Sequence, residues 1–253
     1  MRGPLAGKVA LVTGSSRGIG AGIARAFSEA GATVVINYVQ RKEEAEALAA
    51  ALSRPEQPAI ALQADVSRRD QVAAMVEEIL DRFGRIDILV NNAGVSADGP
   101  LLELDYEAWR RVMAVHVDGT FHCTQLVGRA MRERGQGAIL NISASTAIKG
   151  RVNGASFCAA KAAIIALTKC AALELAPAIR VNCLCPGFVP TDDIVARFGL
   201  RDAARAEALR QSIPLQRLGT LEDMGKAARF LVSDDAAYVT GHLLFANGGL
   251  FMY

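Results

Sequence analysis

The sequence predicts an α/β fold in which one doubly wound parallel sheet of about seven strands carries helices on both faces. Three observations support this prediction. Short apolar runs alternate with longer segments of helical periodicity, the runs are apolar almost without interruption, and glycine, asparagine, aspartate or proline follows most of them. Because no linker, charge block or internal repeat divides the 253 residues, we expect a single domain over residues 1–253.

The predicted strands are short and apolar; they are 9–12, 33–38, 59–64, 86–90, 138–142, 179–184 and 242–245. The predicted helices have apolar residues three to four positions apart; they are 18–30, 41–52, 69–83, 105–134, 156–175 and 221–232. Gly84 and Pro177 end two of these helices. Residues 191–211 are polar, and we expect this segment to be mobile.

Composition excludes several classes of function. The formal net charge of +2 is too small to indicate a nucleic-acid partner, and the five cysteines and three histidines show no metal-ligand spacing. No apolar run approaches the roughly 18 residues that span a bilayer, and residues 1–8 lack the apolar core of a signal peptide. We therefore expect a soluble cytoplasmic protein with reduced cysteines, of which Cys183 and Cys185 are buried in a strand.

The segment from Val9 to Gly20 reads VALVTGSSRGIG, a strand that turns through glycines into a helix. This arrangement is typical of dinucleotide binding. Gly14 permits a tight turn, Gly18 lets the backbone approach a diphosphate, and Gly20 lets the helix pack near the strand, while the helix start offers free N–H groups to the phosphates. The spacing is G-x-x-x-G-x-G, and such a turn alone also fits an ordinary strand-to-helix connection.

Four further motifs follow later strands: Asp65-Val66, Asn91-Asn92-Ala93-Gly94, Pro186-Gly187 and Asn247-Gly248-Gly249. Together with the glycine turn, they make residues 5–252 resemble the short-chain dehydrogenase/reductase family, in particular its group of beta-ketoacyl-carrier-protein reductases and glucose dehydrogenases. The resemblance implies a Rossmann-type fold, a nicotinamide cofactor, carbonyl/alcohol chemistry and a homotetramer built on the long helices and the last strand.

The resemblance also implies which residues contact the cofactor. These are Gly14, Ser16, Ile19 and Gly20 around the diphosphate, Asp65 and Val66 at the adenine edge, Asn91, Ala93 and Gly94 at the adenosine ribose and sheet floor, Lys161 at the nicotinamide ribose, and Pro186, Gly187, Val189 and Thr191 at the nicotinamide.

The end of the second strand favours NADP(H) over NAD(H). NAD-specific sites place a carboxylate on the ribose 2′-hydroxyl at this point, whereas the four residues after Asn37-Tyr38 include no acid. Arg17, together with Arg41 or Lys42, is a candidate charge-assisted donor to a 2′-phosphate. Arg41 and Lys42 fit a solvated helix start equally well.

The catalytic set departs from the family pattern at three of its four positions. The family's Tyr-x-x-x-Lys pair keeps Lys161 but has Phe157 in the tyrosine position, the serine position holds Ala144, and the asparagine position holds His116. Phe157 cannot donate a proton, and Ala144 cannot hydrogen-bond an alkoxide. A positioned acid or base contributes roughly 10²–10⁴-fold, and a lost oxyanion donor costs a comparable factor. We expect severely weakened or altered catalysis.

Three groups are candidate substitutes. His116 has an ordinary pKa of about 6.5 that suits proton transfer near neutrality, although it also fits as a helix histidine that fills the asparagine's space. Ser145 or Ser143 would need a shift of the loop, since Ser145 lies one position off the usual spacing, and both also fit loop hydrogen bonds. Lys161 is a third candidate, which the resemblance assigns to the ribose, and Cys158 is expected to face away.

The segment at about 191–214 corresponds to the family's variable substrate lid. Its apolar residues suit a carbon chain or ring; they are Ile194, Val195, Phe198 and Leu200. Arg201, Arg205 and Arg210 are candidate contacts for an anionic carrier or a phosphopantetheine group, or belong to solvated helix faces.

Three functions remain open from the sequence. The first is an NADP(H)-binding oxidoreductase for a small-molecule carbonyl or alcohol, or for a carrier-bound acyl group, with the altered set described above. The second is a catalytically silent cofactor-binding subunit or sensor, which would co-purify with an active relative. The third is a dehydratase or isomerase on the same fold, with Lys161 or His116 as base.

Overall fold

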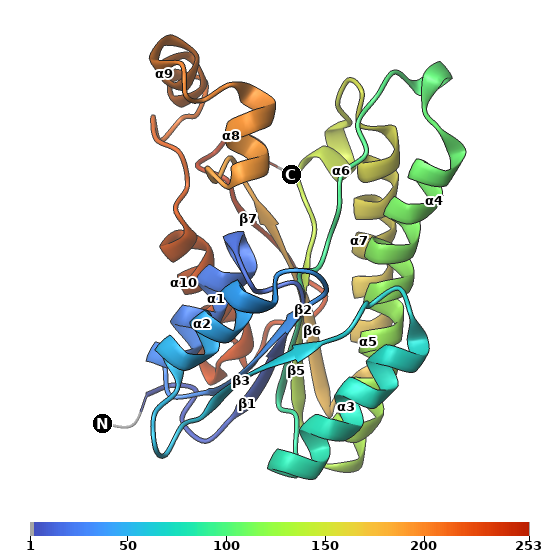
Figure 1. Cartoon of the computed structure of the whole chain (residues 1–253), viewed down its shortest axis with the longest axis vertical. Helices are drawn as coiled ribbons and strands as arrows, with labels where there is room; N and C mark the ends of the chain where they lie inside the picture. The colour runs from blue at the N-terminus through green and yellow to red at the C-terminus, as the bar shows by residue number, and fades with distance from the viewer. Residues whose placement is uncertain (1–2, 253) are drawn as a thin grey trace.

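The computed structural model describes residues 3–252, and a seven-stranded sheet forms its centre (Figure 1). The strands are β1 (Val9–Val12), β2 (Thr33–Tyr38), β3 (Ala59–Gln63), β4 (Ile88–Asn91), β5 (Gly137–Ile142), β6 (Ile179–Pro186) and β7 (Leu243–Ala246). They pair in parallel in the order β3-β2-β1-β4-β5-β6-β7. The predicted doubly wound sheet is confirmed, and every expected strand lies within two residues of its observed bounds.

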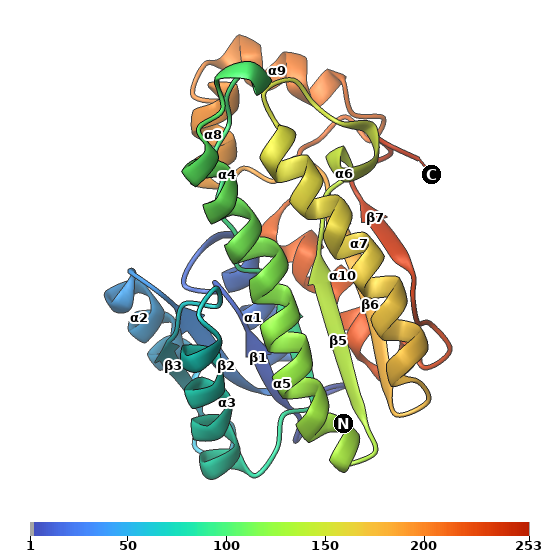
Figure 2. The same ribbon diagram turned by 90° about the vertical axis from the view of Figure 1, so that its right-hand side faces the viewer.

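Helices cover both faces of this sheet (Figures 1 and 2). They are α1 (Gly18–Glu29), α2 (Lys42–Leu52), α3 (Arg69–Phe83), α4 (Tyr106–Met113), α5 (Gly119–Glu133), α6 (Thr146–Lys149), α7 (Ala155–Leu175), α8 (Asp192–Phe198), α9 (Ala203–Gln211) and α10 (Leu221–Val232), with short 3₁₀ turns at Leu101–Glu103 and Asp234–Ala236.

The two layers share the apolar strands between them. Successive strand residues point to opposite faces, so Ala10 and Val12 of β1 pack with α1, α2 and α10, whereas Val9 and Leu11 pack with α3, α5 and α7. Because both faces of the central strands are covered, these strands are apolar throughout. This explains why continuous apolar runs predicted them.

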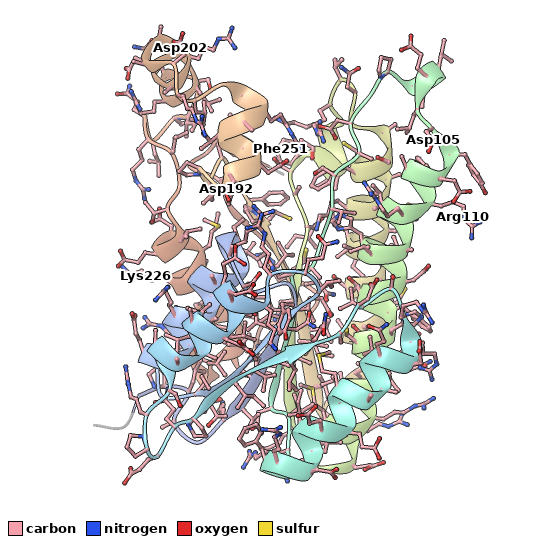
Figure 3. The ribbon with its side chains drawn as sticks, viewed as in Figure 1. Asp105, Arg110, Asp192, Asp202, Lys226 and Phe251 are labelled. Atoms are coloured by element: carbon pink, nitrogen blue, oxygen red, sulfur yellow. The ribbon has the colours of Figure 1, made fainter. Side chains whose placement is uncertain are left out.

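Two helical predictions are corrected. Residues 105–134 do not form one α-helix, because the π-helical turn η2 (Ala114–Asp118) separates α4 from α5. Residues 191–211, expected only as a polar mobile segment, form α8 and α9. Asp202 caps the start of α9 by accepting from the backbone N–H groups of Ala204 and Arg205 (Figure 3). The polar composition of this segment gave no helical pattern in the sequence. Capping by Asp202 stabilises the start of α9.

Helix α7 corrects the expectation that no apolar run is long enough to span a bilayer. Its 21 residues pass that test by length and composition. In the structure, α7 packs beside β6 and buries Ile164, Ile165 and Thr168. Only one face of α7 is covered in this way, since Leu173 is 83% exposed.

The strand order positions a crevice at one edge of the sheet. Connections run outward in opposite directions from β1 and β4, so the order reverses between these neighbouring strands. Ligands of doubly wound sheets bind beyond the carboxyl ends of the strands at such a reversal. Helices α8 and α9 stand at this edge on one side and α6 with the start of α7 on the other (Figures 1 and 2).

Candidate cofactor and substrate cleft

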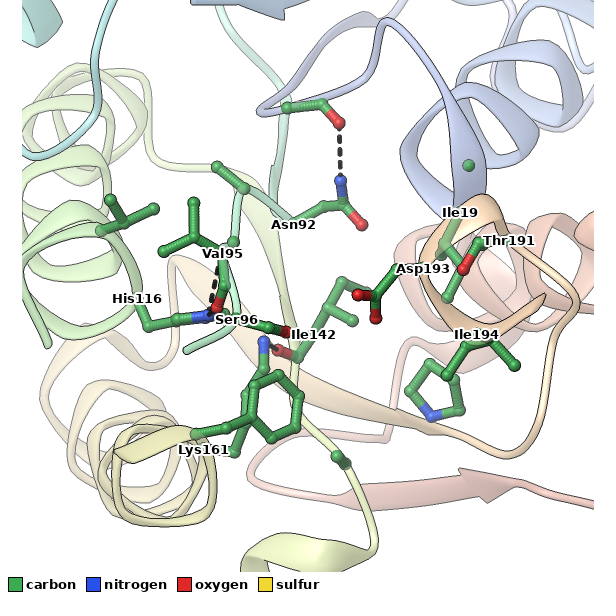
Figure 4. Close-up of a pocket in the computed structure, with 18 of the residues that line it drawn as sticks. Ile19, Asn92, Val95, Ser96, His116, Ile142, Lys161, Thr191, Asp193 and Ile194 are labelled. Atoms are coloured by element: carbon green, nitrogen blue, oxygen red, sulfur yellow. Dashed lines mark hydrogen bonds between the residues drawn. The ribbon is translucent and has the colours of Figure 1, made fainter. Parts of the chain in front are cut away.

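A cleft of about 1360 Å³ opens at the carboxyl edge of the sheet, and Figure 4 shows part of it. Its wall runs from Gly14 after β1, past Asp65 after β3, to Lys161 in α7 and Thr191 before α8. Pockets for drug-sized ligands usually measure about 300–1,000 Å³. The cleft is therefore large enough for a dinucleotide and a second, smaller ligand.

Most residues singled out from the sequence line this one cleft. They are Gly14, Ser16, Arg17, Gly18, Ile19, Asn37, Tyr38, Arg41, Asp65, Val66, Ala93, Gly94, His116, Ala144, Ser145, Phe157, Lys161, Pro186, Gly187, Val189 and Thr191.

Asn91 and Gly20 are exceptions. The Asn91 side chain is buried and its Nδ2 donates to Asn141 Oδ1 at 2.8 Å, between β4 and β5. A Cβ on Gly20 would lie 2.5 Å from Asn92 Nδ2, so this glycine packs α1 against the segment after β4. Both residues stabilise the structure behind the lining of the cleft, and the cofactor contacts predicted for Asn91 and Gly20 stay predictions.

The glycine turn requires its glycines for two different reasons. Gly14 has φ +59°, and a Cβ there would lie 2.7 Å from the Ala93 Cα. Gly18 has φ +58°, a left-handed conformation that side chains other than glycine adopt only at a cost. The turn can therefore lie against the β4 loop only with glycine at position 14.

Two side chains that the sequence reasoning left without a role hold this turn. Thr13 Oγ1 accepts from the backbone N–H groups of Asn92 and Ala93, at 3.0 and 3.1 Å. The Asn92 Nδ2 donates to the carbonyls of Thr13 and Gly14, at 2.9 and 3.0 Å, and Figure 4 draws one of these bonds. Thr13 and Asn92 both belong to the motifs quoted from the sequence, and this membership was the sequence feature that pointed to a role for them.

The start of α1 fits a diphosphate. Its N-cap residue, Arg17, makes no side-chain cap hydrogen bond, and no acid lies in the first helical turn. The first N–H groups of a helix have no partner within the helix and carry a partial positive charge. At α1 they point toward the glycine turn that lines the cleft, as phosphate binding at a helix start requires.

Asn37 has a structural task at the edge of the cleft. Its Oδ1 accepts from Gly14 N–H at 3.1 Å, and its Nδ2 donates to the Ala64 carbonyl at 2.9 Å. The side chain therefore joins the glycine turn to the ends of β2 and β3. An aspartate here would lack the amide donor, so the absence of an acid has a structural cause as well.

The two arginines predicted to contact a 2′-phosphate line the cleft, and each has an acidic partner. Arg17 Nη1 lies 2.9 Å from Asp192 at the start of α8, which Figure 3 labels, and Arg41 Nη1 lies 2.7 Å from Glu44. The Arg17 side chain is 50% exposed and Asp192 is 82% exposed. Such exposed pairs contribute only about 0–1 kcal/mol, so an incoming phosphate can compete with them.

The opposite end of the cleft is built by another close backbone contact. Pro186 ends β6, Gly187 follows it, and a Cβ on Gly187 would lie 2.6 Å from the Asn247 Cα. Asn247 Oδ1 in turn accepts from Gly249 N–H at 3.0 Å. The closing Asn-Gly-Gly motif thus shapes the loop behind the wall that Gly187 and Val189 form.

Lys161 is a buried cation at the centre of the cleft. It is 5% exposed, and its Nζ donates to the Ile142 carbonyl at 2.7 Å. Burial lowers the pKa of Lys161 to about 8, against the thiols of Cys183 and Cys185, which act to raise it. The ammonium group therefore gains and loses its proton close to neutral pH.

His116 lies in the π-helical turn, where it packs over Gly94; a Cβ on that glycine would lie 2.4 Å from the imidazole Cε1. Its Nε2 is 2.8 Å from the Val95 carbonyl and 3.2 Å from the Val95 nitrogen (Figure 4). The shorter contact assigns the hydrogen to Nε2, which donates to the carbonyl. Among residues 3–252, the buried Nδ1 has no hydrogen-bond partner.

The environment of His116 argues against the proton-donor role considered from the sequence. Burial lowers the pKa of His116 to about 3, and the nearby charge of Lys161 adds to this, while the Val95 carbonyl opposes it. The imidazole is therefore neutral near pH 7, and its one N–H is already used. The alternative, a histidine that fills the asparagine's space, fits the observed burial.

The positions that carry hydroxyl groups in the family pattern offer none to the cleft. Phe157 and Ala144 line it, and the Phe157 ring lies edge-on to His116 with centroids 5.6 Å apart. Ser143 donates its hydroxyl to the Lys161 carbonyl at 2.8 Å, so it is not free to polarise a ligand. Ser145 lines the cleft and makes no side-chain cap hydrogen bond to α6, which leaves it as a candidate polar contact.

An ionic network that sequence reasoning missed crosses the mouth of the cleft. Arg151 donates twice to Asp98, at 2.7 and 2.6 Å. Arg197 of α8 lies 3.3 Å from the same carboxylate, and it also contacts Asp193 and the Ser96 hydroxyl at 2.9 Å. The partners come from three distant segments, and their spacing in the sequence gave no sign of the network.

Comparison with known proteins gives a consistent result. A family profile described as enoyl-(acyl carrier protein) reductase matches residues 14–251. A 3-oxoacyl-[acyl-carrier-protein] reductase of Synechocystis is 40% identical over 251 residues, which cover 98% of this chain and 99% of the relative. The enzyme of the same name from Staphylococcus aureus strain Mu50 is 40% identical over 246 residues, 97% of this chain and 98% of that one.

Solved structures extend the likeness. A gluconate 5-dehydrogenase from Burkholderia cenocepacia, in complex with NADP and tartrate, superposes with a TM-score of 0.90 at 38% identity, covering 97% of this chain and 96% of that one. An NAD⁺-bound xylitol dehydrogenase gives a TM-score of 0.91 at 32% identity, covering 97% and 99%. These neighbours bind different nicotinamide cofactors, so the choice between them depends on local residues.

Proposed function

Because the chain belongs to the short-chain dehydrogenase/reductase family, we propose that it binds NADP(H) in the cleft and interconverts a carbonyl and an alcohol without the family's tyrosine and serine hydroxyls. One observation carries the proposal. The same cleft is lined by the glycine turn, by the buried Lys161, and by Phe157 and Ala144 at the positions of the family's hydroxyl groups. The family's oxidoreductase relatives support the reaction class.

The proposal assigns the cofactor contacts to residues that line the cleft, with the role of Lys161 taken from the family resemblance. Gly14, Gly18 and the start of α1 hold the diphosphate, and Arg17 with Arg41 contacts the 2′-phosphate through charge-assisted hydrogen bonds. Lys161 holds the nicotinamide ribose. When bound, NADP(H) supplies or accepts the hydride.

Lys161 is also the source of the proton in this proposal. Phe157 and Ala144 have none to give, and the only N–H of neutral His116 is bound to the Val95 carbonyl. Lys161 Nζ, with a pKa of about 8, is protonated at neutral pH and acidic enough to pass a proton to a developing alkoxide, directly or through one water. Deprotonated Lys161 takes the proton back when the alcohol is oxidised.

The test is NADPH oxidation by the full chain over a panel of ketones, aldehydes and beta-ketoacyl thioesters, followed across pH. We expect slow turnover of at least one substrate, and a rate of reduction that falls as the pH rises through about 8, since Lys161 then loses its proton. Lys161→Arg stays charged in this range, so it should lose that inflection even where it still binds NADPH. A profile that is flat between pH 7 and 9 would overturn the role of Lys161.

A second function is favoured by the same substitutions. Because neither Phe157, Ala144 nor neutral His116 can donate a proton to a ligand, the chain also fits a silent subunit or sensor that binds NADP(H). Saturable NADPH binding, with no oxidation of any carbonyl in the panel, would select this alternative.

The homotetramer stays a prediction from the family resemblance, and the cytoplasmic location stays a prediction from the composition of the sequence. Exposed apolar side chains on α4 and α5 support self-association; Tyr106 is 68% exposed and Phe121 is 47% exposed. Light scattering after size exclusion distinguishes a tetramer from a monomer.

A further inference from the structure

The substrate half of the cleft is rich in positive charge. We define it as the lining residues from 93 to 198, which include two acids, Asp192 and Asp193, and five basic residues: Arg111, Lys149, Arg151, Lys161 and Arg197. Asp192 is already paired with Arg17 of the glycine turn. Asp98 pairs with both Arg151 and Arg197, so the remaining excess of basic groups consists of Arg111, Lys149 and Lys161, and it favours a ligand with negative charge.

Three of these cations lack an acidic partner in the described part of the chain. No ion pair within residues 3–252 includes Arg111, Lys149 or Lys161. The case of Lys161 matters most, because its ammonium group is buried. The Lys161 Nζ lies over the Phe157 ring, 5.6 Å from the ring centroid, and this ring carries no formal charge. A buried cation without an anion is costly, and it adds to the positive charge of the substrate half.

Arg151 is held against the same ring from another direction. Its side chain lies across Gly154, where a Cβ would come within 2.5 Å of the Arg151 Cγ and 2.8 Å of its Cζ. The guanidinium carbon is 5.3 Å from the centroid of Phe157. The ring therefore lies near two cations, Arg151 and Lys161, at the position where the family pattern places the catalytic hydroxyl.

The hydrogen bonds of Arg151 within residues 3–252 occupy only part of its guanidinium group. Two of its five N–H groups point to the Asp98 carboxylate, which shows that this edge fits a carboxylate in the two-pronged geometry that arginine favours. Asp98 is shared with Arg197, so one carboxylate serves two guanidinium groups.

We propose that the substrate is a small oxo or hydroxy acid, and that the Arg151 guanidinium positions its carboxylate beside the Phe157 ring. The ligand brings negative charge to a half of the cleft that is rich in basic groups. Contacts with Gly154 and with the Phe157 ring fix the Arg151 side chain in place. In this orientation the carboxylate of the substrate lies at Arg151, and the carbonyl group of the substrate lies toward Lys161. This inference names the substrate class of the proposed function and rests on it for the reaction.

The test compares two ligands of similar size, the anion acetoacetate and its neutral amide, acetoacetamide. Their affinities are measured by titration calorimetry on the full chain, free and saturated with NADP⁺. We expect acetoacetate to bind about 10-fold more tightly than the amide, as a charge-assisted pair predicts. Arg151→Gln should bring the two affinities within about 2-fold, by loss of that same pair.

Two further variants make the result specific. Gly154→Ala keeps the Arg151 charge but displaces its side chain, so it should also reduce the preference for the acid. Arg54→Gln removes the same charge at the opposite edge of the sheet, before β3, and should leave the preference intact. Equal binding of acid and amide by the unmodified chain would overturn the inference, as would a preference that survives both Arg151→Gln and Gly154→Ala in folded protein.

The outcome is separable from that of the proposed function. A preference for the acid without any NADPH oxidation supports the carboxylate site and contradicts the reaction. Turnover of neutral ketones, with no preference for the acid, supports the reaction and contradicts the carboxylate site.

Discussion

The two halves of the cleft rest on different kinds of structure. The cofactor half, which comprises the lining residues from 14 to 92, depends on backbone geometry. Gly14 and Gly18 have positive φ, the start of α1 has no side-chain cap, and Asn92 donates to the Thr13 carbonyl. The substrate half depends on single side-chain groups, and it has a phenyl ring and a methyl group where the family pattern has hydroxyls. Side-chain chemistry can therefore change completely while the fold and the glycine turn stay intact.

The largest effect is expected where the cofactor half depends on close backbone contact. Gly14→Ala adds a Cβ 2.7 Å from the Ala93 Cα at a residue with φ +59°, so the turn must move and NADPH affinity should fall by at least about 100-fold. Fluorescence titration of NADPH measures this.

Gly7→Ala is the matched control for that change. Gly7 has φ +73°, and a Cβ added there would meet no atom of residues 3–252 within 4 Å, so alanine carries only the conformational cost of about 1–2 kcal/mol. If both variants bind NADPH like the unmodified chain, the turn does not hold the cofactor.

An intermediate effect is expected from the buried imidazole of the substrate half. The folded chain holds the pKa of His116 at about 3, below the ordinary value of about 6.5. Between these values the unfolded chain binds the proton more tightly, so stability falls as the pH drops, by up to about 1.4 kcal/mol per pH unit.

His116→Asn should remove this part of the acid sensitivity. Urea unfolding at pH 7.5 and at pH 5 should show that the unmodified chain loses about 2 kcal/mol more than the variant does. The same loss in both proteins would mean that His116 is protonated in the folded state, and would restore it as a candidate acid.

The smallest effect concerns cofactor choice. Arg17→Gln should weaken NADPH binding by about 10-fold and leave NADH binding nearly unchanged, because the lost pair involves only the 2′-phosphate. Competition titrations with both cofactors measure the ratio. An equal loss for NADH would assign Arg17 to the diphosphate or to the Asp192 contact in place of the 2′-phosphate.

The sequence was most informative where the presence of a residue type at a position has a single structural explanation. Apolar runs predicted the strands because both sheet faces are covered, and the glycine turn predicted the cleft because only glycine fits there. It was least informative where distant segments meet. Neither the network around Asp98 nor the low pKa of His116 follows from neighbours in the chain, since both depend on contacts between loops. The π-helical turn was hidden because its apolar pattern continues that of α4.

The central claim is that one cleft combines a competent cofactor half with a substrate half that lacks its proton-donating hydroxyls. It is tested most directly by measuring NADPH affinity and NADPH oxidation on the chain and on its Ala144→Ser/Phe157→Tyr variant. We predict affinities within about 2-fold of each other, because the substitutions do not touch the phosphate-binding turn, and a rate about 10²-fold or more higher in the variant. An unmodified chain that turns over as fast as the variant would contradict the account.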